Sequence, residues 1–500
     1  MKQPMLNYRS KRAWTLKPLA CAALAVVLSA CSLPRISQAP AGAQPAMPAH
    51  WKQVAAATHN QAQLQSAWWQ AFGDAGLNAW VGLALEQSND VLTAMARVDE
   101  ARANLELAGA AAMPQVSAAL PVSSGRSLGA RGLTQTRSLQ PGLQASWELD
   151  VWNRLGDLRS AADLRLQASQ ADGDAVQLAV AATTAQAYIG LRSLQAQLSV
   201  AQYTLQSREA AVRLLTDQVR VGYISQLQQS QALAELESVR QSIEQLTLAL
   251  ERQRLALLQL AGGIGDASAQ KLMGETLPGR AATQPQGDLE ALAVPALPAL
   301  GLPSELLERR PDIARAQLQL AASDKQLAAQ RAAFLPQVSL SANLGSLLIN
   351  ALDYHPATVW GLGGSILAPL FSGGRLQGQF DAANAQRDQA AYAYRGTVIK
   401  ALGDVQLALV STQYLQTQWA SARQRGAVLQ RTLGFAKDRY EAGYASYLEE
   451  LDAQRNLFAV QQEVIRLRQS QLENAVQLYQ ALGGGWQKTA SATATATPEK

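Results

Sequence analysis

The feature that most constrains the fold of this 500-residue chain is an apolar heptad pattern that occurs twice. In the later copy, apolar or small residues recur in steps of three, four, seven and, once, eleven on both sides of Gly443, which predicts a coiled-coil seam. No proline lies between Pro369 and Pro498, so we expect two long antiparallel helices joined at Gly443. The earlier copy turns at Gly222. Further positions match at the same offset of 221, namely Ile243 to Val464, Leu246 to Leu467 and Gly262 to Gly483. The chain is therefore read as two copies of one unit.

Each copy changes from a helical to an extended pattern at the same four residues, Pro-Gln-Val-Ser, which begin at Pro114 and Pro336. Beyond them, apolar and polar residues alternate with a period of two, which predicts strands with one apolar and one polar face. The apolar positions are Leu143, Ala145, Trp147, Leu149 and Val151 in the first copy and Val338, Leu340, Ala342 and Leu344 in the second. The linkers 123–137 and 346–358 are predicted as outside loops.

Two strands per copy are too few for a sheet that is stable alone, because an isolated hairpin is marginal. A half-buried sheet on a soluble core is one interpretation. A transmembrane barrel is the other, since it turns apolar residues to lipid and leaves no unpaired edge. We expect a mainly α fold with a membrane β-barrel portion, four strands per protomer and long coiled-coil hairpins in tandem repeat. Residues 157–219 alone predict one helix of roughly 95 Å, far longer than a compact domain needs.

The amino terminus has the pattern of a secretion signal. Five Lys or Arg residues precede the apolar run 19–30, which ends in Leu28-Ser29-Ala30-Cys31 and resembles a lipobox. Cleavage would leave Cys31 as an acylated first residue that anchors the chain to a membrane. An ordinary cleaved signal and a retained anchor are the alternatives, although the run is shorter than the roughly 20 residues that span a bilayer.

Charge and reactive residues exclude several classes of function. Residues 1–30 hold five of the 43 Lys and Arg and no acid, so the mature chain carries 38 basic and 38 acidic residues and has no nucleic-acid footprint. Only Cys31 remains of the two cysteines, so no disulfide framework is expected. His50, His59 and His355 are isolated from other metal-ligand residues, and no catalytic triad or phosphate loop is present. We expect no enzyme, no metal and no cofactor.

The predicted organisation is a signal peptide (1–30), an acylated tether (31–66), a first repeat (67–265), a linker or equatorial segment (266–301), a second repeat (302–484) and a disordered tail (485–500). Each repeat opens with a helix. The first pattern runs from near Trp80 to before Pro114, and the second runs from Leu302 to Phe334.

Four runs of residues, in order behind the lipobox, resemble the TolC-like outer-membrane efflux proteins, in particular the lipoprotein subunits of tripartite multidrug pumps of the NodT/OprM type. The runs are 68–74, 147–150, 302–313 and 440–443 with 451–455. The resemblance covers nearly all of the mature chain. It implies a homotrimer with a twelve-stranded barrel in the outer membrane, continued by a long helical barrel through the periplasm. It also implies two partners, a periplasmic adaptor protein and an inner-membrane pump of the RND type.

The resemblance further implies a periplasmic gate at the second hairpin. The matching residues are Tyr440 as a gate tyrosine, Glu449 and Asp452 as an acidic ring on one helix face, and Arg455 as a salt-bridge partner. The alternative interpretation is that these are ordinary solvated positions of a coiled coil. Ala445 stands where some relatives carry a gating arginine, and 225–229 lack the acid that many have. Any electrostatic lock is therefore expected mainly on the second hairpin.

Two functions from different classes are compatible with these patterns. The first is a passive exit duct that an inner-membrane pump drives through an adaptor packed on the tips at Gly222, Tyr223, Gly443 and Tyr444. The second is a lipid-anchored periplasmic scaffold, which would have no use for strands with an apolar face. Within the duct interpretation, the residues do not separate drug efflux from metal efflux or type I protein secretion. The lipobox favours the drug-efflux subgroup.

Overall fold

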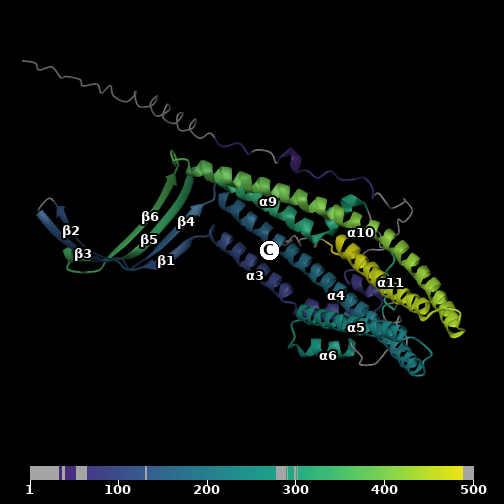
Figure 1. Cartoon of the computed structure of the whole chain (residues 1–500). Coiled ribbons are helices and arrows are strands. Elements are labelled where there is room, and N and C mark those ends of the chain that lie inside the picture. Colours follow the sequence, from purple (N-terminus) through teal and green to yellow (C-terminus); the bar gives the residue numbers. More distant parts are fainter. Residues whose placement is uncertain are drawn as a thin grey trace, which may run out of the picture. The chain divides into compact units, whose positions relative to one another are not determined.

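A computed structural model of the chain describes residues 33–36, 40–51, 65–129, 132–276, 289, 291–297, 300 and 302–487. Cys31 and the predicted signal lie outside these residues, as does His59. The chain divides into two compact units (Figure 1). The strand unit comprises residues 1–44, 100–166 and 318–393, and the helix unit comprises residues 45–99, 167–317 and 394–500.

Helices make up most of the described chain, and Figure 1 labels the main ones. The short 3-10 helices are η1 (Ala41–Ala43), η2 (Trp68–Phe72), η3 (Pro303–Glu305) and η4 (Asn350–Leu352). The α-helices are α2 (Ala75–Gln87), α3 (Asn89–Ala110), α4 (Arg154–Arg220), α5 (Gln226–Leu260), α6 (Ala267–Thr276), α8 (Leu306–Arg309), α9 (Pro311–Ala332), α10 (Arg375–Glu441) and α11 (Tyr447–Ala481).

The two predicted hairpins are present and have matching lengths. Helices α4 and α10 each contain 67 residues, about 100 Å at the usual rise per residue, and α5 and α11 each contain 35. The single helix predicted over 157–219 is confirmed as part of α4. No proline interrupts any of the four helices, and apolar faces at heptad spacing supply their packing surface.

The helix predicted between Trp80 and Pro114 is interrupted. Ser88 is extended and buried, and it separates α2 from α3 while its hydroxyl accepts a hydrogen bond from the Asp90 amide. The corresponding pattern of the second copy breaks at Arg310, which is also extended because it precedes Pro311. Both predictions of one continuous helix were wrong at these points.

A sheet of six strand segments lies in the strand unit (Figure 1). The segments are β1 (Gln115–Ala119), β2 (Val122–Gly129), β3 (Gly132–Leu139), β4 (Gly142–Leu149), β5 (Gln337–Ile349) and β6 (Ala357–Leu367). All pairings are antiparallel, and the central run has the order β1, β4, β5, β6. Strands β2 and β3 form a hairpin that touches β5 only at its end.

The prediction that 123–137 is a loop was wrong, because these residues form most of the β2 and β3 hairpin. The predicted loop 346–358 is shorter than expected, since β5 continues to Ile349 and β6 starts at Ala357. Pro121 and Pro141, which cannot donate to a strand ladder, separate β1 from β2 and β3 from β4. The four predicted strand passes therefore appear as six segments.

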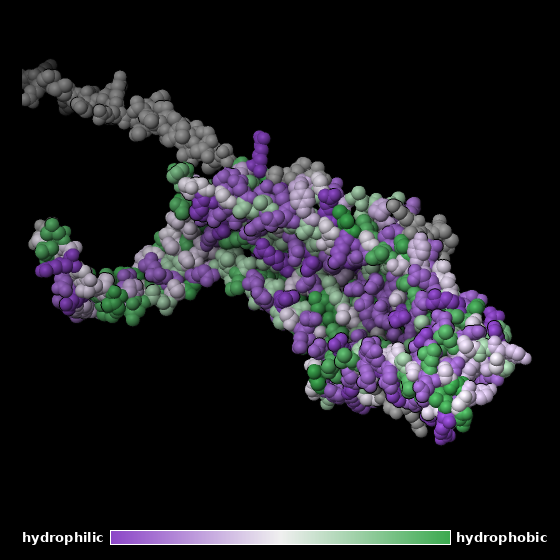
Figure 2. All heavy atoms as spheres, viewed as in Figure 1, coloured by the Kyte–Doolittle hydropathy of each residue, from purple (hydrophilic) through white to green (hydrophobic). Residues whose placement is uncertain are grey.

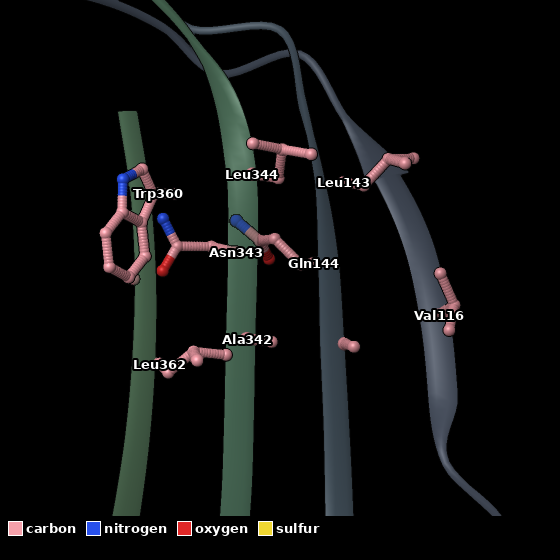
Figure 3. Close-up of a pocket in the computed structure, with 10 residues that line it drawn as sticks. Val116, Leu143, Gln144, Ala342, Asn343, Leu344, Trp360 and Leu362 are labelled. Atoms are coloured by element: carbon pink, nitrogen blue, oxygen red, sulfur yellow. The ribbon is translucent and has the colours of Figure 1, made fainter. Parts of the chain in front are cut away.

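The register places apolar side chains on one face of the central run. Leu143 pairs with Leu344, which pairs with Trp360, and Ala145 pairs with Ala342, which pairs with Leu362. Figure 3 shows these side chains on adjacent strands. The residues between them, including Gln144, Ser341 and Asn343, lie on the opposite face. The period-two prediction is confirmed for these strands.

The largest core of the helix unit joins η2 and α2 to α4, α5, α6 and α11. Trp68 stacks on Tyr479, with ring centroids 5.6 Å apart, and Trp80 donates a hydrogen bond to Thr276 on α6. Trp51, which lies in the segment predicted as a tether, is buried in a second core against Leu306 and Val405.

No helix within the described ranges is both long and apolar enough to span a bilayer.

Candidate functional site

The two hairpins of the helix unit turn in the same way. Gly222 and Gly443 have φ values of 74° and 77°, a left-handed conformation that favours glycine. At each turn the glycine amide donates a hydrogen bond to the carbonyl three residues earlier. The amide of the following tyrosine donates to the carbonyl five residues earlier, which is that of Gln218 in the first hairpin and Arg439 in the second. This pair of bonds is a Schellman motif, which satisfies the last carbonyls of α4 and α10. The tyrosines that follow the two glycines, Tyr223 and Tyr444, are 80% and 81% exposed.

Behind the turns, side chains of both hairpins form one apolar cluster, called here the tip cluster. Its buried members are Leu215 of α4, Ala232 of α5, and Tyr447 and Leu451 of α11. Val212, Ile224 and Tyr440 pack against them. The tip cluster therefore holds the first hairpin against the second.

Tyr440, the predicted gate tyrosine, lies at the edge of the tip cluster. Its ring is 5.7 Å from that of Tyr447 and tilted by 60°. Burial, with the nearby charge of Glu450, raises the pKa of Tyr440. The phenol is therefore neutral at physiological pH and acts as a packing and hydrogen-bonding group.

The two predicted ring acids are exposed on the first turns of α11. Glu449 lies 3.7 Å from Arg439 at the end of α10, and Asp452 lies 3.2 Å from Arg455. Their side chains are 50% and 56% exposed. At that exposure each ion pair is worth at most ~1 kcal/mol. Both acids thus remain available to solvent.

Arg455 reaches the first hairpin as well as its own helix. Its Nη2 lies 2.5 Å from Oε1 of Glu235 on α5, whose side chain is only 17% exposed. This contact joins the two hairpins, and the expectation that any electrostatic lock lies mainly on the second hairpin stays a prediction. Glu235 was not predicted, because the acid was expected within 225–229 and lies further along α5. The sequence does indicate that Glu235 is partly buried, because it lies between Ala232 and Leu236, two buried positions of α5.

Two further charged residues of this region were not anticipated from the sequence. Arg208 of α4 is 3% exposed, and burial lowers its pKa, against the opposing effects of Tyr447 and Glu235. Burial is the main cause that raises the pKa of Glu450 on α11. A heptad pattern marks apolar positions and gave no signal for a buried arginine.

The structure thus pairs Asp452 with Arg455 and Glu449 with Arg439, and it packs Tyr440 separately on the tip cluster. Ala445, next to the turn, offers no charge to these pairs. Within the described ranges, no three His, Cys, Asp or Glu side chains are grouped as metal ligands would be.

Comparison with known proteins assigns a family. The model of the family described as outer membrane efflux protein matches residues 80–263 and 302–484. The chain is 33% identical to the pyoverdine export outer membrane protein OpmQ of Pseudomonas aeruginosa, over 95% of this chain and 98% of that protein. It is 32% identical to the cation efflux system protein CusC of Escherichia coli O157:H7, over 94% and 98%. A crystal structure of a membrane protein from Pseudomonas aeruginosa matches with a TM-score of 0.79 and 28% identity, covering 93% of this chain and 99% of that one. The chain therefore belongs to the outer membrane efflux protein family and is an outer membrane protein.

Proposed function

We propose that this protein is the outer-membrane duct of a tripartite efflux system, a passive exit for drugs and other small toxic compounds. Family members are efflux proteins rather than enzymes, and the described residues offer no grouped metal ligands. The energy for transport then comes from an inner-membrane pump of the RND type, reached through a periplasmic adaptor. The exposed tyrosines at both hairpin turns, Tyr223 and Tyr444, are the proposed adaptor contact.

The observation that carries this proposal is the exposed apolar face of the sheet. Figure 2 shows hydrophobic residues, in green, along the strands. Trp360, Leu362 and Ile366 of β6 are 72%, 79% and 74% exposed, and Leu143 and Leu344 are 52% and 56% exposed. Exposing such a face to water costs free energy, whereas contact with lipid is favourable. The polar opposite face suits a wet lumen.

The two outer strands of the central run support a barrel that closes through further copies. Within the described residues, β1 pairs only with β4 and β6 pairs only with β5, so each leaves one edge unpaired. Open edges are not tolerated in lipid. Pairing β6 of one protomer with β1 of the next, in a homotrimer, would give twelve strands and no edge.

The helices supply a second argument for the trimer. Exposed apolar residues recur along α10 at steps of seven or eight and, once, fourteen: Ile399 (50%), Leu407 (65%), Tyr414 (61%), Val428 (43%) and Phe435 (68%). An exposed apolar stripe of this kind marks a contact surface. We assign it to a neighbouring protomer in the helical barrel.

Within this duct, Glu449 and Asp452 are the proposed cation-favouring constriction and Tyr440 and Arg455 the proposed residues of the closed gate. The exposure of both carboxylates supports this assignment. Three copies of each acid around one axis would attract cations and repel anions. Cys31 is the proposed lipid anchor, and loss of palmitate labelling in a Cys31→Ala variant would be the direct check.

In this proposal the partner pump, more than this chain, selects the substrate. The relatives export pyoverdine in one case and cations in another, so metal efflux is the second candidate substrate class, and type I protein secretion is a third. A Pseudomonas putida relative, at 32% identity, is named a toluene efflux pump outer membrane protein. We favour small toxic organic compounds, and drug-susceptibility profiling of a deletion strain would separate these classes.

Conductance in a planar lipid bilayer tests the duct directly. We expect the purified protein to form pores with a preference for cations, and the Glu449→Ala/Asp452→Ala double variant to lose part of that preference because the ring charge is removed. Glu441→Ala, an exposed acid at the end of α10 outside the proposed ring, is the matched control. Absence of pores where a known porin conducts would favour the alternative, a lipid-anchored periplasmic scaffold.

A further inference from the structure

Strands β2 and β3 continue the hairpin of β1 and β4 without a change of register (Figure 1). Ala119 pairs with Gly142 at the end of β1, and Val122 pairs with Leu139 at the start of β2. Each strand has the same number of residues between these two pairs, so no residue is inserted on either side. Because side chains alternate between faces, each face of β1 and β4 continues onto β2 and β3.

The face that continues the apolar side of the sheet changes from apolar to basic beyond Leu139. Leu143 and Leu139 lie on this face, and Leu348 of β5 pairs with Leu139. The next residue on the same face is Arg137, and Arg126 lies diagonally across from it on β2. Diagonal neighbours on paired strands are about 7 to 8 Å apart, so one ligand can contact both guanidinium groups.

The opposite face of this hairpin carries no charge among the described residues. The Oγ atoms of Ser123 and Ser138 lie 2.8 Å apart there. Its other side chains are likewise hydroxyls or glycine: Gly125, Ser127, Thr134 and Thr136. The two arginines are therefore gathered on the side that continues the apolar face, and Leu128 and Leu133 end that side next to the turn.

No acid neutralises the two arginines. Both side chains are exposed, and within the described residues no carboxylate lies at ion-pair distance from either. The sequence has no Asp or Glu between Glu106 and Glu148. The backbone of Arg137 is nevertheless held, because its amide donates to the side chain of Asn350 at 3.0 Å. That side chain in turn donates to the carbonyl of Gln135 at 2.8 Å, so the arginines are fixed at the end of β5.

The arginines lie just beyond the apolar band of the sheet. The chain enters β1 from α3 and leaves β4 into α4, so the turn between β2 and β3 lies at the end away from these helices. In the proposed duct this is the outer end. The positions from Leu149 to Leu139 span about 33 Å along the strand, which is about 25 Å of height at a barrel tilt of roughly 40°. That height matches the apolar band of outer-membrane barrels, so the guanidinium groups reach the level of the lipid headgroups.

We propose that Arg126 and Arg137 bind a phosphate of the glycolipid headgroups in the outer leaflet, with Leu139 and Leu348 against the acyl chains. A guanidinium matches phosphate oxygens with two parallel hydrogen bonds and keeps its charge at any physiological pH. Two such groups without an acid complement a headgroup that carries negative charge. This rests on the proposed barrel, which gives the apolar face its contact with lipid.

Titration of the purified protein in detergent with diphosphorylated lipid A tests the arginine pair, with bound lipid counted by native mass spectrometry. We expect Arg126→Gln/Arg137→Gln to weaken binding about tenfold, because each change removes a charge that attracts an anionic headgroup. Arg126→Lys/Arg137→Lys keeps the charge but loses the paired hydrogen bonds, so its affinity should lie between the two. Arg213→Gln/Arg431→Gln, which changes exposed arginines of α4 and α10, is the matched control and should bind as the wild type does.

Two further ligands identify the source of the phosphate. The same glycolipid without its phosphates should bind the wild type about tenfold more weakly. Inorganic pyrophosphate should not displace lipid A, because it has no acyl chains to contact the apolar face. Lipid A binding that is unchanged in the glutamine variant, or equal binding of the two glycolipids, would overturn the proposal. Displacement by pyrophosphate would also overturn it, since the site would then be one for a soluble phosphate.

Conductance in a planar bilayer separates this proposal from the duct itself. The wild type and the glutamine variant should both form pores, because the arginines lie outside the proposed lumen. Wild-type protein that forms no pores would count against the barrel. Pores together with unchanged lipid binding in the glutamine variant would count against the arginine pair alone.

Discussion

Arg310 shows how a buried guanidinium is held when its partners are complete. It is 8% exposed and donates two hydrogen bonds to Asp312, at 3.0 and 2.7 Å, and a third to the carbonyl of Ala481 at 2.9 Å. The last bond ties the start of α9 to the end of α11. Burial alone would raise the pKa of Asp312, but the hydrogen bonds and charge of Arg310 outweigh it and lower that pKa.

Replacing Arg310 should therefore be strongly destabilising. Arg310→Met leaves the half-buried Asp312 carboxylate without its cation, and loss of one member of a buried pair costs about 3 kcal/mol or more. Thermal unfolding of the detergent-solubilised protein measures this effect. The neighbour Arg309, 41% exposed and paired with Glu305, provides the control, since Arg309→Ala should cost about 0.5 kcal/mol or less. Equal losses in the two variants would contradict the assigned role.

Glu450 should make the stability of the hairpin ends depend on pH. Burial, partly opposed by Lys437, raises the pKa of this carboxyl in the folded state. A raised pKa means that the charged form is disfavoured on folding, so stability increases as the pH falls through the folded-state pKa toward the ordinary value of about 4.3. We expect Glu450→Gln to unfold at a higher temperature than the wild type at pH 8, and the two midpoints to converge near pH 4. If Glu450→Gln instead unfolded at a lower temperature than the wild type at pH 8, the charged carboxylate would be stabilised by its partners.

At the scale of elements, the accuracy of the sequence predictions follows the strength of each local signal. The long helices were predictable because a heptad pattern without proline extends over dozens of residues. Strands β4 and β5 were predictable because their apolar residues alternate. The β2 and β3 hairpin was missed because its residues are mostly Gly, Ser, Thr and Gln, and its pairing is set by the register with its partner strand. The break at Ser88 was missed because a single extended serine leaves the apolar pattern around it intact.

The candidate site divides in the same way. The turn glycines and the acids Glu449 and Asp452 were found from the offset between the copies and from the family resemblance. Glu235 and Arg208 were not, because their roles arise where two hairpins distant in sequence meet. The sequence shows that Glu235 lies on the α5 seam, but only the tertiary structure shows that it pairs with Arg455.

The turn glycines give a prediction about the hairpin as an element. Gly443 has φ 77°, so Gly443→Ala should lose about 1 kcal/mol of stability because an L side chain is strained there. Gly434 lies within α10, and an added Cβ there would meet nothing within 4 Å. Gly434→Ala should therefore gain about 0.5 to 1 kcal/mol through higher helix propensity. Thermal unfolding of both variants distinguishes a conformational requirement at Gly443 from a general sensitivity to alanine.

At the scale of the whole molecule, the exposed stripe on α10 predicts an effect on assembly. Leu407 is 65% exposed in one protomer, and we expect it to be buried in the trimer. Leu407→Lys should weaken the trimer, because burying an unpaired ammonium is costly. Native mass spectrometry or light scattering measures the mass of the assembly. Gln413→Lys, an exposed polar position of the same helix, should leave the trimer intact. A trimer unaffected by Leu407→Lys would place the protomer contact elsewhere.

The two unpaired strand edges, on β1 and on β6, have a genetic consequence. The proposed barrel closes only if each protomer pairs with both of its neighbours. A subunit with one damaged edge therefore prevents closure even when the other two subunits are normal. When such an allele is expressed beside the normal gene, every mixed ring of the proposed trimer contains at least one defective contact. Damage to either border strand should therefore behave as a dominant trait, whereas loss of the whole gene should behave as a recessive one.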